Sequence, residues 1–306
     1  MNEIKTVAIV GGGLIGASWA ALFIAHGIDV VAWDPDVTAR EQFRDRMSAA
    51  RKQLAALGRR GRGRLKIVAR LKAALADADF IQENAPEKLE LKHRLFGEIA
   101  AAAKPLATIA SSTSSFSWSQ LTDGMADPSR LIVSHPFNPP HLVPLVELYG
   151  TDAGRVAAAA DFYEAMGKVT IRMKREAPGH VANRLASALY REAVHIVAEG
   201  IADVADVDKA LVEGPGLRWA IQGAHMTYHL GGGDGGIRHY LDHLGPSQEK
   251  RWAALGQPAL TSEVKAAIVR GVEAEAAGRS IAELAAERDT MLIETLKLRA
   301  KKRRGP

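Results

Sequence analysis

The feature that most constrains the fold is a glycine-rich turn, Gly11-Gly12-Gly13-Leu14-Ile15-Gly16, which fits the pattern G-x-G-x-x-G. It follows the β-branched run Thr6–Val10 directly and opens a helical pattern over residues 15–26. In that context a glycine turn brings free backbone N–H groups and the positive end of a helix dipole to a pyrophosphate. The pattern therefore predicts a dinucleotide-binding strand–helix unit. The cofactor contacts that we expect here come from Gly11, Gly13, Leu14, Ile15 and Gly16.

An acidic residue, Asp34, follows the second apolar run and lies 18 residues after Gly16. A carboxylate at this place accepts hydrogen bonds from the adenosine ribose hydroxyls and repels a 2′-phosphate. Asp36 adds a second acid, and the nearest arginine is Arg40. We therefore expect NAD rather than NADP as the cofactor.

The two halves of the chain follow different periodicities. Short apolar runs alternate with helical patterns in the first half, which predicts β-α-β units with strands near residues 6–10, 29–33, 79–82, 107–110, 131–133 and 169–172. Residues 143–148 fit either a further strand or an edge piece. From His180 onward the apolar residues recur at helical spacing. We predict an α/β fold, with a Rossmann-type, doubly wound, mostly parallel sheet over residues 1–176 and an all-α substrate and dimerisation domain over residues 177–306.

Composition restricts the cellular setting. The chain contains no cysteine, which removes disulfides and cysteine nucleophiles and is compatible with a reducing cytoplasm. No signal-peptide pattern opens the sequence, and His26, Gly27 and Asp29 interrupt the one long apolar stretch. We expect a cytoplasmic protein that does not engage a membrane.

The net charge of +5 comes largely from residues 51–72 and from the tail of residues 301–304. No aromatic residues interleave with these basic segments, as stacking on single-stranded nucleic acid requires, so we expect no nucleic-acid partner. The tail reads as a solvated helix end, which the helix dipole favours.

A histidine at the end of a predicted strand is the candidate catalytic base. His135 follows the run 131–133, on the rim where open α/β sheets bind ligands, and Glu147 comes 12 residues later. Imidazole titrates near working pH and suits the removal of a hydroxyl proton, while a neighbouring carboxylate orients the ring. Spacing alone would favour a structural histidine beside a surface glutamate over a catalytic pair.

Six segments, taken together in their order, resemble the 3-hydroxyacyl-CoA dehydrogenase family: GGGLIG, ENAPEKLELK, SSTSSFSW, SHPFNPP, VPLVELYG and PGHVANRL. The resemblance implies His135 as general base and Glu147 as its orienting partner. It also implies contacts of Ser114 and Asn183 with the substrate oxygen, and a supporting role for Asn138. The same resemblance places Glu87 and Lys92 against the nicotinamide half of NAD.

Within the family, the segments GPGLRWA and HLGGGDGG resemble the branch of carnitine dehydrogenases and lambda-crystallin, a gulonate dehydrogenase. Aromatic faces hold a trimethylammonium cation without hydrogen bonds, and the candidates are Phe137, Trp219 and Tyr228. Arg218 is a candidate partner for a carboxylate. The chain departs from the branch at residues 221–224, where it carries IQGA.

From these patterns we rank oxidation of a small 3-hydroxy acid first, with L-carnitine as the best candidate substrate. The second candidate is a 3-hydroxyacyl-CoA ester, whose phosphates would meet the arginines of residues 59–64. The third is L-gulonate, and a non-enzymatic, crystallin-like protein remains as a reading from another class. His225, His229, His239 and His243 stand at helical spacing, but we predict no metal site. The resemblance also implies a homodimer formed through the C-terminal domain.

Overall fold

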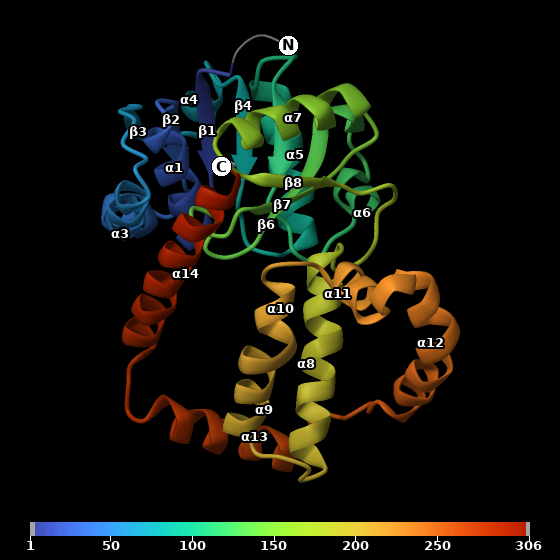
Figure 1. Cartoon of the computed structure of the whole chain (residues 1–306). Coiled ribbons are helices and arrows are strands. Elements are labelled where there is room, and N and C mark those ends of the chain that lie inside the picture. The colour runs from blue at the N-terminus through green and yellow to red at the C-terminus, as the bar shows by residue number, and fades with distance from the viewer. Residues whose placement is uncertain (1–3, 304–306) are drawn as a thin grey trace. The chain divides into compact units, whose positions relative to one another are not determined.

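The apolar runs of the first half form an eight-stranded sheet in the computed structural model, which describes residues 4–303 (Figure 1). The strands are β1 (Thr6–Val10), β2 (Asp29–Trp33), β3 (Leu65–Val68), β4 (Phe80–Glu83), β5 (Thr108–Ser111), β6 (Leu131–Pro136), β7 (Leu145–Tyr149) and β8 (Val169–Arg172). Their spatial order is β3-β2-β1-β4-β5-β6-β7-β8, and β1 to β6 are parallel. The chain winds outward in both directions from β1 and β4, so the predicted doubly wound, mostly parallel sheet is confirmed.

Both faces of the sheet are covered by helices, which explains why β1 and β4 to β6 consist almost wholly of buried residues. On one face Trp19, Phe23, Phe43 and Tyr163 form the centre of the core. On the other face Phe96, Ile99 and Leu121 pack against the strands. The helices that supply these residues are α1 (Leu14–Ala25), α3 (Phe43–Ala56) and α7 (Ala153–Ala165) on the first face, and α4 (Leu71–Leu75), α5 (Leu89–Ala102) and α6 (Trp118–Thr122) on the second.

One strand was not predicted from the sequence, and another settles an alternative that the sequence left open. The sequence indicated no strand at β3, because its four residues lie among arginines and lysines and only Leu65 and Ile67 carry the apolar alternation of an edge strand. Residues 145–149 form an inner strand rather than an edge piece, since β7 pairs antiparallel with β6 and parallel with β8. This one antiparallel pair positions the candidate site.

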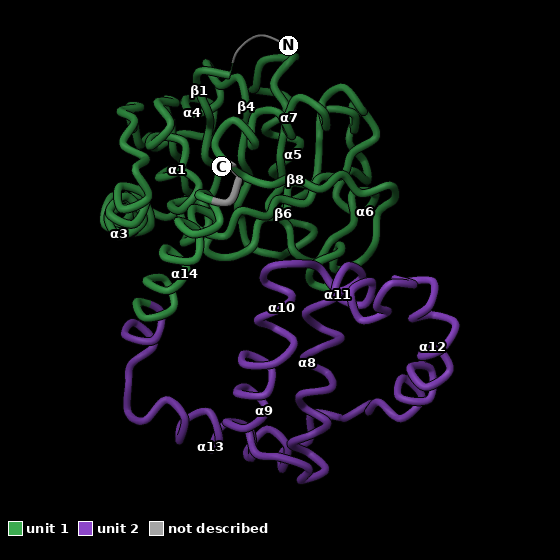
Figure 2. The backbone as a smooth tube through the Cα atoms, viewed as in Figure 1, with its two compact units in different colours: residues 1–184, 286–306 green, residues 185–285 purple. Residues whose placement is uncertain are grey.

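The chain divides into two compact units (Figure 2). One comprises the described residues through Arg184 and from Ala286 onward, and the other comprises Leu185–Ala285. The boundary at residues 176/177, expected from the sequence, stays a prediction. None of the helices among residues 4–303 has the length and apolarity needed to cross a bilayer.

The second unit, described in full, consists of helices joined by turns and contains no strand. Its helices are α8 (Ala182–Ala198), whose first turn belongs to the other unit, α9 (Val204–Leu211), α10 (Leu217–Trp219), α11 (Ala224–Gly231), α12 (Gly236–Ala254) and α13 (Ser262–Ala276). The predicted helical second half is therefore confirmed. Many of its large apolar side chains are exposed, among them Leu185, Leu189 and Leu241.

The last helix, α14 (Ile281–Arg303), begins at a capping box formed by Ser280 and Glu283. The backbone N–H of Ser280 donates to Glu283 at 2.8 Å, and the Glu283 N–H donates to the Ser280 hydroxyl at 3.3 Å. The predicted solvated tail ends at Arg304, which lies outside the described residues.

Farther along α14, a polar chain connects the helix to the sheet domain. Gln53 donates to Asp289 at 2.9 Å, and its amide oxygen accepts a hydrogen bond from Nε2 of His141 at 2.5 Å. Nδ1 of His141 lies 2.8 Å from the Ser18 hydroxyl, which satisfies a neutral ring at both nitrogens. Burial lowers the pKa of His141 to about 4.

This shift predicts an acid sensitivity of the fold. Between pH 6.5 and about 4 the unfolded histidine binds a proton that the folded one does not, so stability falls as the pH falls through this window. At about 1.4 kcal/mol per pKa unit, the loss is roughly 3 kcal/mol. Urea titrations at several pH values measure it, and the His141→Gln variant should lose less stability over the same window. Equal slopes in the two proteins would show that His141 is not responsible.

Candidate active site

The glycine turn leaves β1 and enters α1 in a conformation that glycines permit. Gly11 has φ of +101°, and a Cβ there would lie 2.7 Å from the carbonyl of Asn84. A Cβ on Gly16 would lie 2.0 Å from the Gly11 oxygen. Around the position of a Cβ on Gly13, by contrast, there is open space, and Leu14 beside it is exposed. The turn is therefore closely packed on its inner side and open where a phosphate would approach.

Asp34 follows β2 and turns its carboxylate toward this loop. One oxygen accepts from the backbone N–H of Gly12 at 2.6 Å, and the other accepts from the N–H of Asp36 at 2.9 Å. Arg40 donates to the backbone carbonyl of Asp34 at 2.6 Å and leaves the carboxylate free of that cation. The acid is thus held next to the turn, at the carboxyl end of the second strand.

His135 and Glu147 are paired across two strands. The antiparallel register of β6 and β7 sets His135 directly opposite Glu147, which brings two residues 12 positions apart into contact. Nδ1 of His135 lies 2.7 Å from Oε2 of Glu147, and the two side chains are buried at 5% and 0% exposure. Because the carboxylate only accepts, the ring donates from Nδ1, and Nε2 of the neutral ring carries the free lone pair.

The second oxygen of Glu147 is bound by the start of α8. The backbone N–H groups of Val181 and Ala182 donate to Oε1 at 2.8 and 3.0 Å. Burial, the largest single effect, raises the pKa of Glu147, but the hydrogen bonds from His135, Ala182 and Val181 together lower it below its usual value. The carboxylate is therefore kept ionised and accepts the hydrogen bond from Nδ1 of His135.

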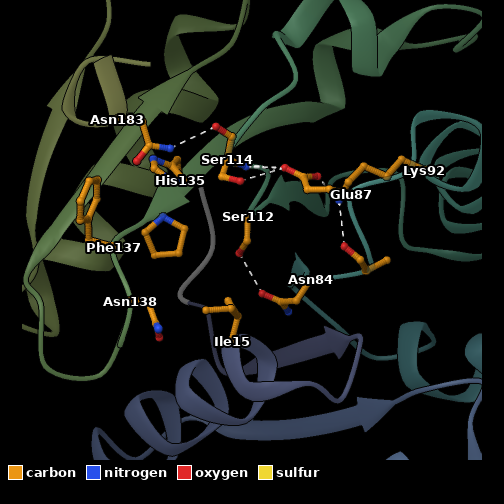
Figure 3. A pocket seen from close by; sticks show the side chains of 12 residues that line it. Ile15, Asn84, Glu87, Lys92, Ser112, Ser114, His135, Phe137, Asn138 and Asn183 are labelled. Atoms are coloured by element: carbon orange, nitrogen blue, oxygen red, sulfur yellow. Dashed lines mark hydrogen bonds and ion pairs between the residues drawn. The ribbon is translucent and has the colours of Figure 1, made fainter. Parts of the chain in front are cut away.

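A cavity of about 430 Å³ lies at the carboxyl ends of β4, β5 and β6 (Figure 3). Most of the predicted site residues of the first unit line it: Ile15, Glu87, Lys92, Ser114, His135, Phe137, Asn138 and Asn183. Figure 3 shows their side chains around the cavity; they come from α1, α5, β6, the turns after the strands and the start of α8. The structure thus brings the predicted base and the glycine turn to the same cavity.

Glu87 organises the turn that carries Ser114. Its Oε1 accepts from the Ser114 N–H at 2.6 Å, from the Ser115 N–H at 3.1 Å and from the Thr113 hydroxyl at 2.8 Å. Burial raises the pKa of Glu87, but the charge of Lys92 and these hydrogen bonds lower it below its usual value. An ionised Glu87 therefore fixes the position of the Ser114 hydroxyl.

Lys92 is almost wholly buried, at 1% exposure, between two carboxylates. Its Nζ lies 2.8 Å from Glu83, which has no exposed surface, and 3.4 Å from Glu87. It also donates to the carbonyl of Ala85 at 3.2 Å. Lys92 therefore forms an ion pair with Glu87 and also lines the cavity.

Asn183 and Phe137 approach the cavity from other elements. The side-chain amide of Asn183 donates to the Ser114 carbonyl at 3.2 Å, which ties the first turn of α8 to the Ser114 turn. The ring of Phe137 meets the ring of His135 edge-on at 5.6 Å. Arg218, Trp219 and Tyr228 belong to the second unit, on α10 and α11, and their side chains are partly or largely exposed there.

Three polar residues that line or adjoin the cavity were not assigned from the sequence. Asn84 and Ser112 line the cavity, and the Ser112 hydroxyl donates to the side-chain oxygen Oδ1 of Asn84 at 2.8 Å. Polar residues directly after β4 and β5 were the signal that could have found them. The third, His180, packs its ring 4.9 Å from the ring of His135.

No metal-binding group of three or more histidine and carboxylate side chains occurs among the described residues 4–303. His239 and His243 contact each other, with ring centroids 4.2 Å apart.

Comparisons with known proteins agree with this geometry. Residues 6–177 match the family model described as 3-hydroxyacyl-CoA dehydrogenase, NAD binding domain, and residues 179–269 match the C-terminal domain of the same family. The chain is 48% identical to an L-carnitine dehydrogenase of Streptomyces coelicolor, over 100% of this chain and 97% of that protein. It is 43% identical to an L-carnitine dehydrogenase of Pseudomonas putida, over 97% of this chain and 94% of that protein.

Solved structures of other dehydrogenases are also similar to this chain. A 5-dehydrogenase of a pyridine carboxylic acid, titled an NAD+-dependent dismutase, superposes with a TM-score of 0.83 at 27% identity, covering 97% of this chain and 98% of that one. A 3-hydroxybutyryl-CoA dehydrogenase of Escherichia coli superposes with a TM-score of 0.62 at 30% identity, covering 70% of this chain and 47% of that one.

Proposed function

Because the chain belongs to the 3-hydroxyacyl-CoA dehydrogenase family, we propose that it oxidises the 3-hydroxyl of L-carnitine to 3-dehydrocarnitine with NAD. The observation that carries the chemistry is the buried His135–Glu147 pair, because His135 lines the same cavity as Ile15 of the glycine turn. The identity of the substrate rests on the curated L-carnitine dehydrogenases, which match nearly the full chain at 40–48% identity.

The first unit is suited to hold NAD. The open space at Gly13 and the N-terminus of α1 fit a pyrophosphate, and the carboxylate of Asp34 fits ribose hydroxyls. Glu87 and Ile15 are placed to contact the nicotinamide half, since both line the cavity beside His135. When bound, NAD accepts the hydride that leaves the carbinol carbon.

In this proposal His135 takes the hydroxyl proton on Nε2. The proton already on Nδ1 stays in the hydrogen bond to Glu147, whose negative charge stabilises the imidazolium that forms. The Ser114 hydroxyl and the Asn183 amide are placed to bind the substrate oxygen, and Asn138 and Phe137 bound the same space. Holding the oxygen near Nε2 raises the rate by removing orientational freedom.

The cationic end of carnitine has aromatic candidates in both units. Phe137 lines the cavity of the first unit. In the second unit Tyr228 lines a cavity of about 480 Å³ together with Tyr240, Trp252 and the carboxylates of Asp242 and Glu249. Aromatic faces and nearby acids favour a trimethylammonium group. Trp219 and Arg218 remain proposed contacts for the cation and the carboxylate.

Initial rates of NAD reduction with L-carnitine, 3-hydroxybutyryl-CoA and L-gulonate test the substrate. We expect the highest kcat/KM with L-carnitine. In the CoA alternative, the arginines of residues 59–64 would bind the CoA phosphates. Two of these arginines already have partners in the protein: Arg64 is paired with Asp29 at 2.6 Å, and Arg59 donates to the Met166 carbonyl at 2.5 Å. A higher kcat/KM with the CoA ester or the sugar acid would overturn the proposal.

We propose further that the protein is a cytoplasmic homodimer assembled through its second unit. The exposed apolar side chains of α8, α10, α12 and α13 support an interface, because a monomer rarely leaves so many uncovered. Sedimentation should give about twice the chain mass of 32.8 kDa, and a persistent monomer would refute the assembly. The absence of cysteine supports the cytoplasm, and recovery in another cell fraction would refute that placement.

A further inference from the structure

The segment that joins the two units makes an unusual turn immediately beside the dyad. Gly179 and His180 both have positive φ, +73° and +51°. This double turn aims the next two backbone N–H groups, those of Val181 and Ala182, at the same oxygen of Glu147. Successive N–H groups that converge on one anion form an anion-binding nest. The two positive φ angles therefore let the backbone bind the carboxylate of Glu147.

Histidine is one of the side-chain residues found more often at positive φ, but it adopts that conformation less readily than glycine. Glycine adopts positive φ freely, whereas a side chain with a Cβ is strained there. The backbone role alone would therefore be served better by glycine at position 180. A side chain held at positive φ next to the proposed reactive groups points to a use of that side chain.

The ring of His180 is 1% exposed and touches two parts of the proposed machinery. Its centroid lies 4.9 Å from that of the His135 ring, with an angle of 38° between the planes. Its Nε2 lies 3.1 Å from the carbonyl oxygen of Thr113, which can only accept, so Nε2 carries the proton. Thr113 in turn donates to Glu87 and precedes Ser114.

The environment also keeps this second imidazole neutral. Burial is the main cause that lowers the pKa of His180, and a charge on His135 lowers it further. A neutral ring can remain packed against His135 while His135 gains a proton. The contact therefore persists through the proton transfer that we propose.

We propose that His180 is a positioning residue, whose neutral ring holds the imidazole of His135 at a set distance from the Ser114 turn. This inference rests on the proposed dehydrogenase function. Neither the base nor Ser114 alone defines the place of the substrate oxygen, because they come from different strands. His180 packs against the ring of His135, and its Nε2 donates to the carbonyl of Thr113, the residue before Ser114.

Two substitutions separate the parts of this role. Asparagine tolerates positive φ but lacks the ring, so His180→Asn tests the ring without straining the backbone. Phenylalanine keeps a ring but lacks the Nε2 donor, so His180→Phe tests the bond to Thr113. His93→Asn is the matched control, because His93 lies in α5 and is not among the residues that line the cavity.

We expect His180→Asn to lower kcat by about tenfold to a hundredfold, with KM for NAD nearly unchanged, because misplacement of reacting groups is costly. His180→Phe should fall between His180→Asn and wild type. Wild-type kcat in His180→Asn would overturn the proposal. A joint loss of kcat, NAD affinity and thermal stability would also overturn it, because the ring would then serve the fold alone.

A readout without substrate keeps this test apart from the proposed function. Diethyl pyrocarbonate modifies accessible imidazoles, and mass spectrometry of the peptide that contains His135 gives the rate. We expect faster modification of His135 in His180→Asn than in wild type, because the covering ring is gone. An unchanged rate would contradict the positioning role, whichever substrate the enzyme accepts.

Discussion

The His135→Gln variant is expected to lose about three orders of magnitude in kcat, which is within the range that a general base contributes. Glutamine can keep a hydrogen bond to Glu147, but its amide does not accept a proton at working pH. The glycine turn and Asp34 are untouched by the change, so the affinity for NAD should be retained. Absorbance of NADH gives kcat, and fluorescence titration gives the affinity.

His93→Gln serves as the control for this prediction, since it removes a histidine that does not line the cavity. Its kcat should equal that of the wild type. A His135→Gln protein that retained most of its kcat would exclude His135 as the base. A parallel loss of NAD affinity would instead show that the imidazole serves the cofactor site.

The second large effect concerns the buried ion pair between Lys92 and Glu83. Lys92→Met should lower the free energy of unfolding by about 3–5 kcal/mol, the cost of leaving one charge of a buried pair without its partner. Glu83 would remain buried with only the Ala85 N–H at 2.6 Å and the Ser111 hydroxyl at 2.5 Å as donors. Chemical denaturation measures the loss.

Two further variants check the cause of that loss. Lys88→Met, at an exposed position just before α5, should cost little, because surface charges contribute little to stability. The double variant Glu83→Gln/Lys92→Met should recover part of the stability, because it removes the charge that Lys92→Met leaves behind. If the double variant were the less stable of the two, the ion-pair explanation would be wrong.

Much of the first unit could be predicted from local patterns. The glycine turn, the acidic residue after the second strand and the buried apolar runs each express a local rule of backbone conformation or burial. Those rules sufficed for the sheet class, for the cofactor and for the strand that carries His135. Family resemblance supplied the roles of Ser114, Asn183 and Glu87, which spacing alone left open.

The features that could not be predicted depend on long-range pairing. The antiparallel register that sets Glu147 opposite His135 depends on β7 lying between β6 and β8, and no local pattern specifies that neighbour. Strand β3 could not be recognised in the sequence, because arginines and lysines surround its short apolar alternation. The role of Lys92 depends on Glu83, nine residues earlier on another element.

His180 illustrates the same limit at the site itself. In the sequence it is one polar residue between a glycine and a valine. Its positive φ and its contact with His135 appear only when the start of α8 meets the end of β6.

We propose that this chain removes hydride from carbon 3 of a hydroxy acid while His135 takes the hydroxyl proton. L-Carnitine carrying deuterium at carbon 3, incubated with the enzyme and NAD, tests the hydride half directly by mass spectrometry of the reduced cofactor. We predict that the deuterium is recovered in the nicotinamide and that the His135→Gln protein transfers far less of it in the same time. Reduced cofactor without deuterium, or equal transfer by the two proteins, would contradict the account.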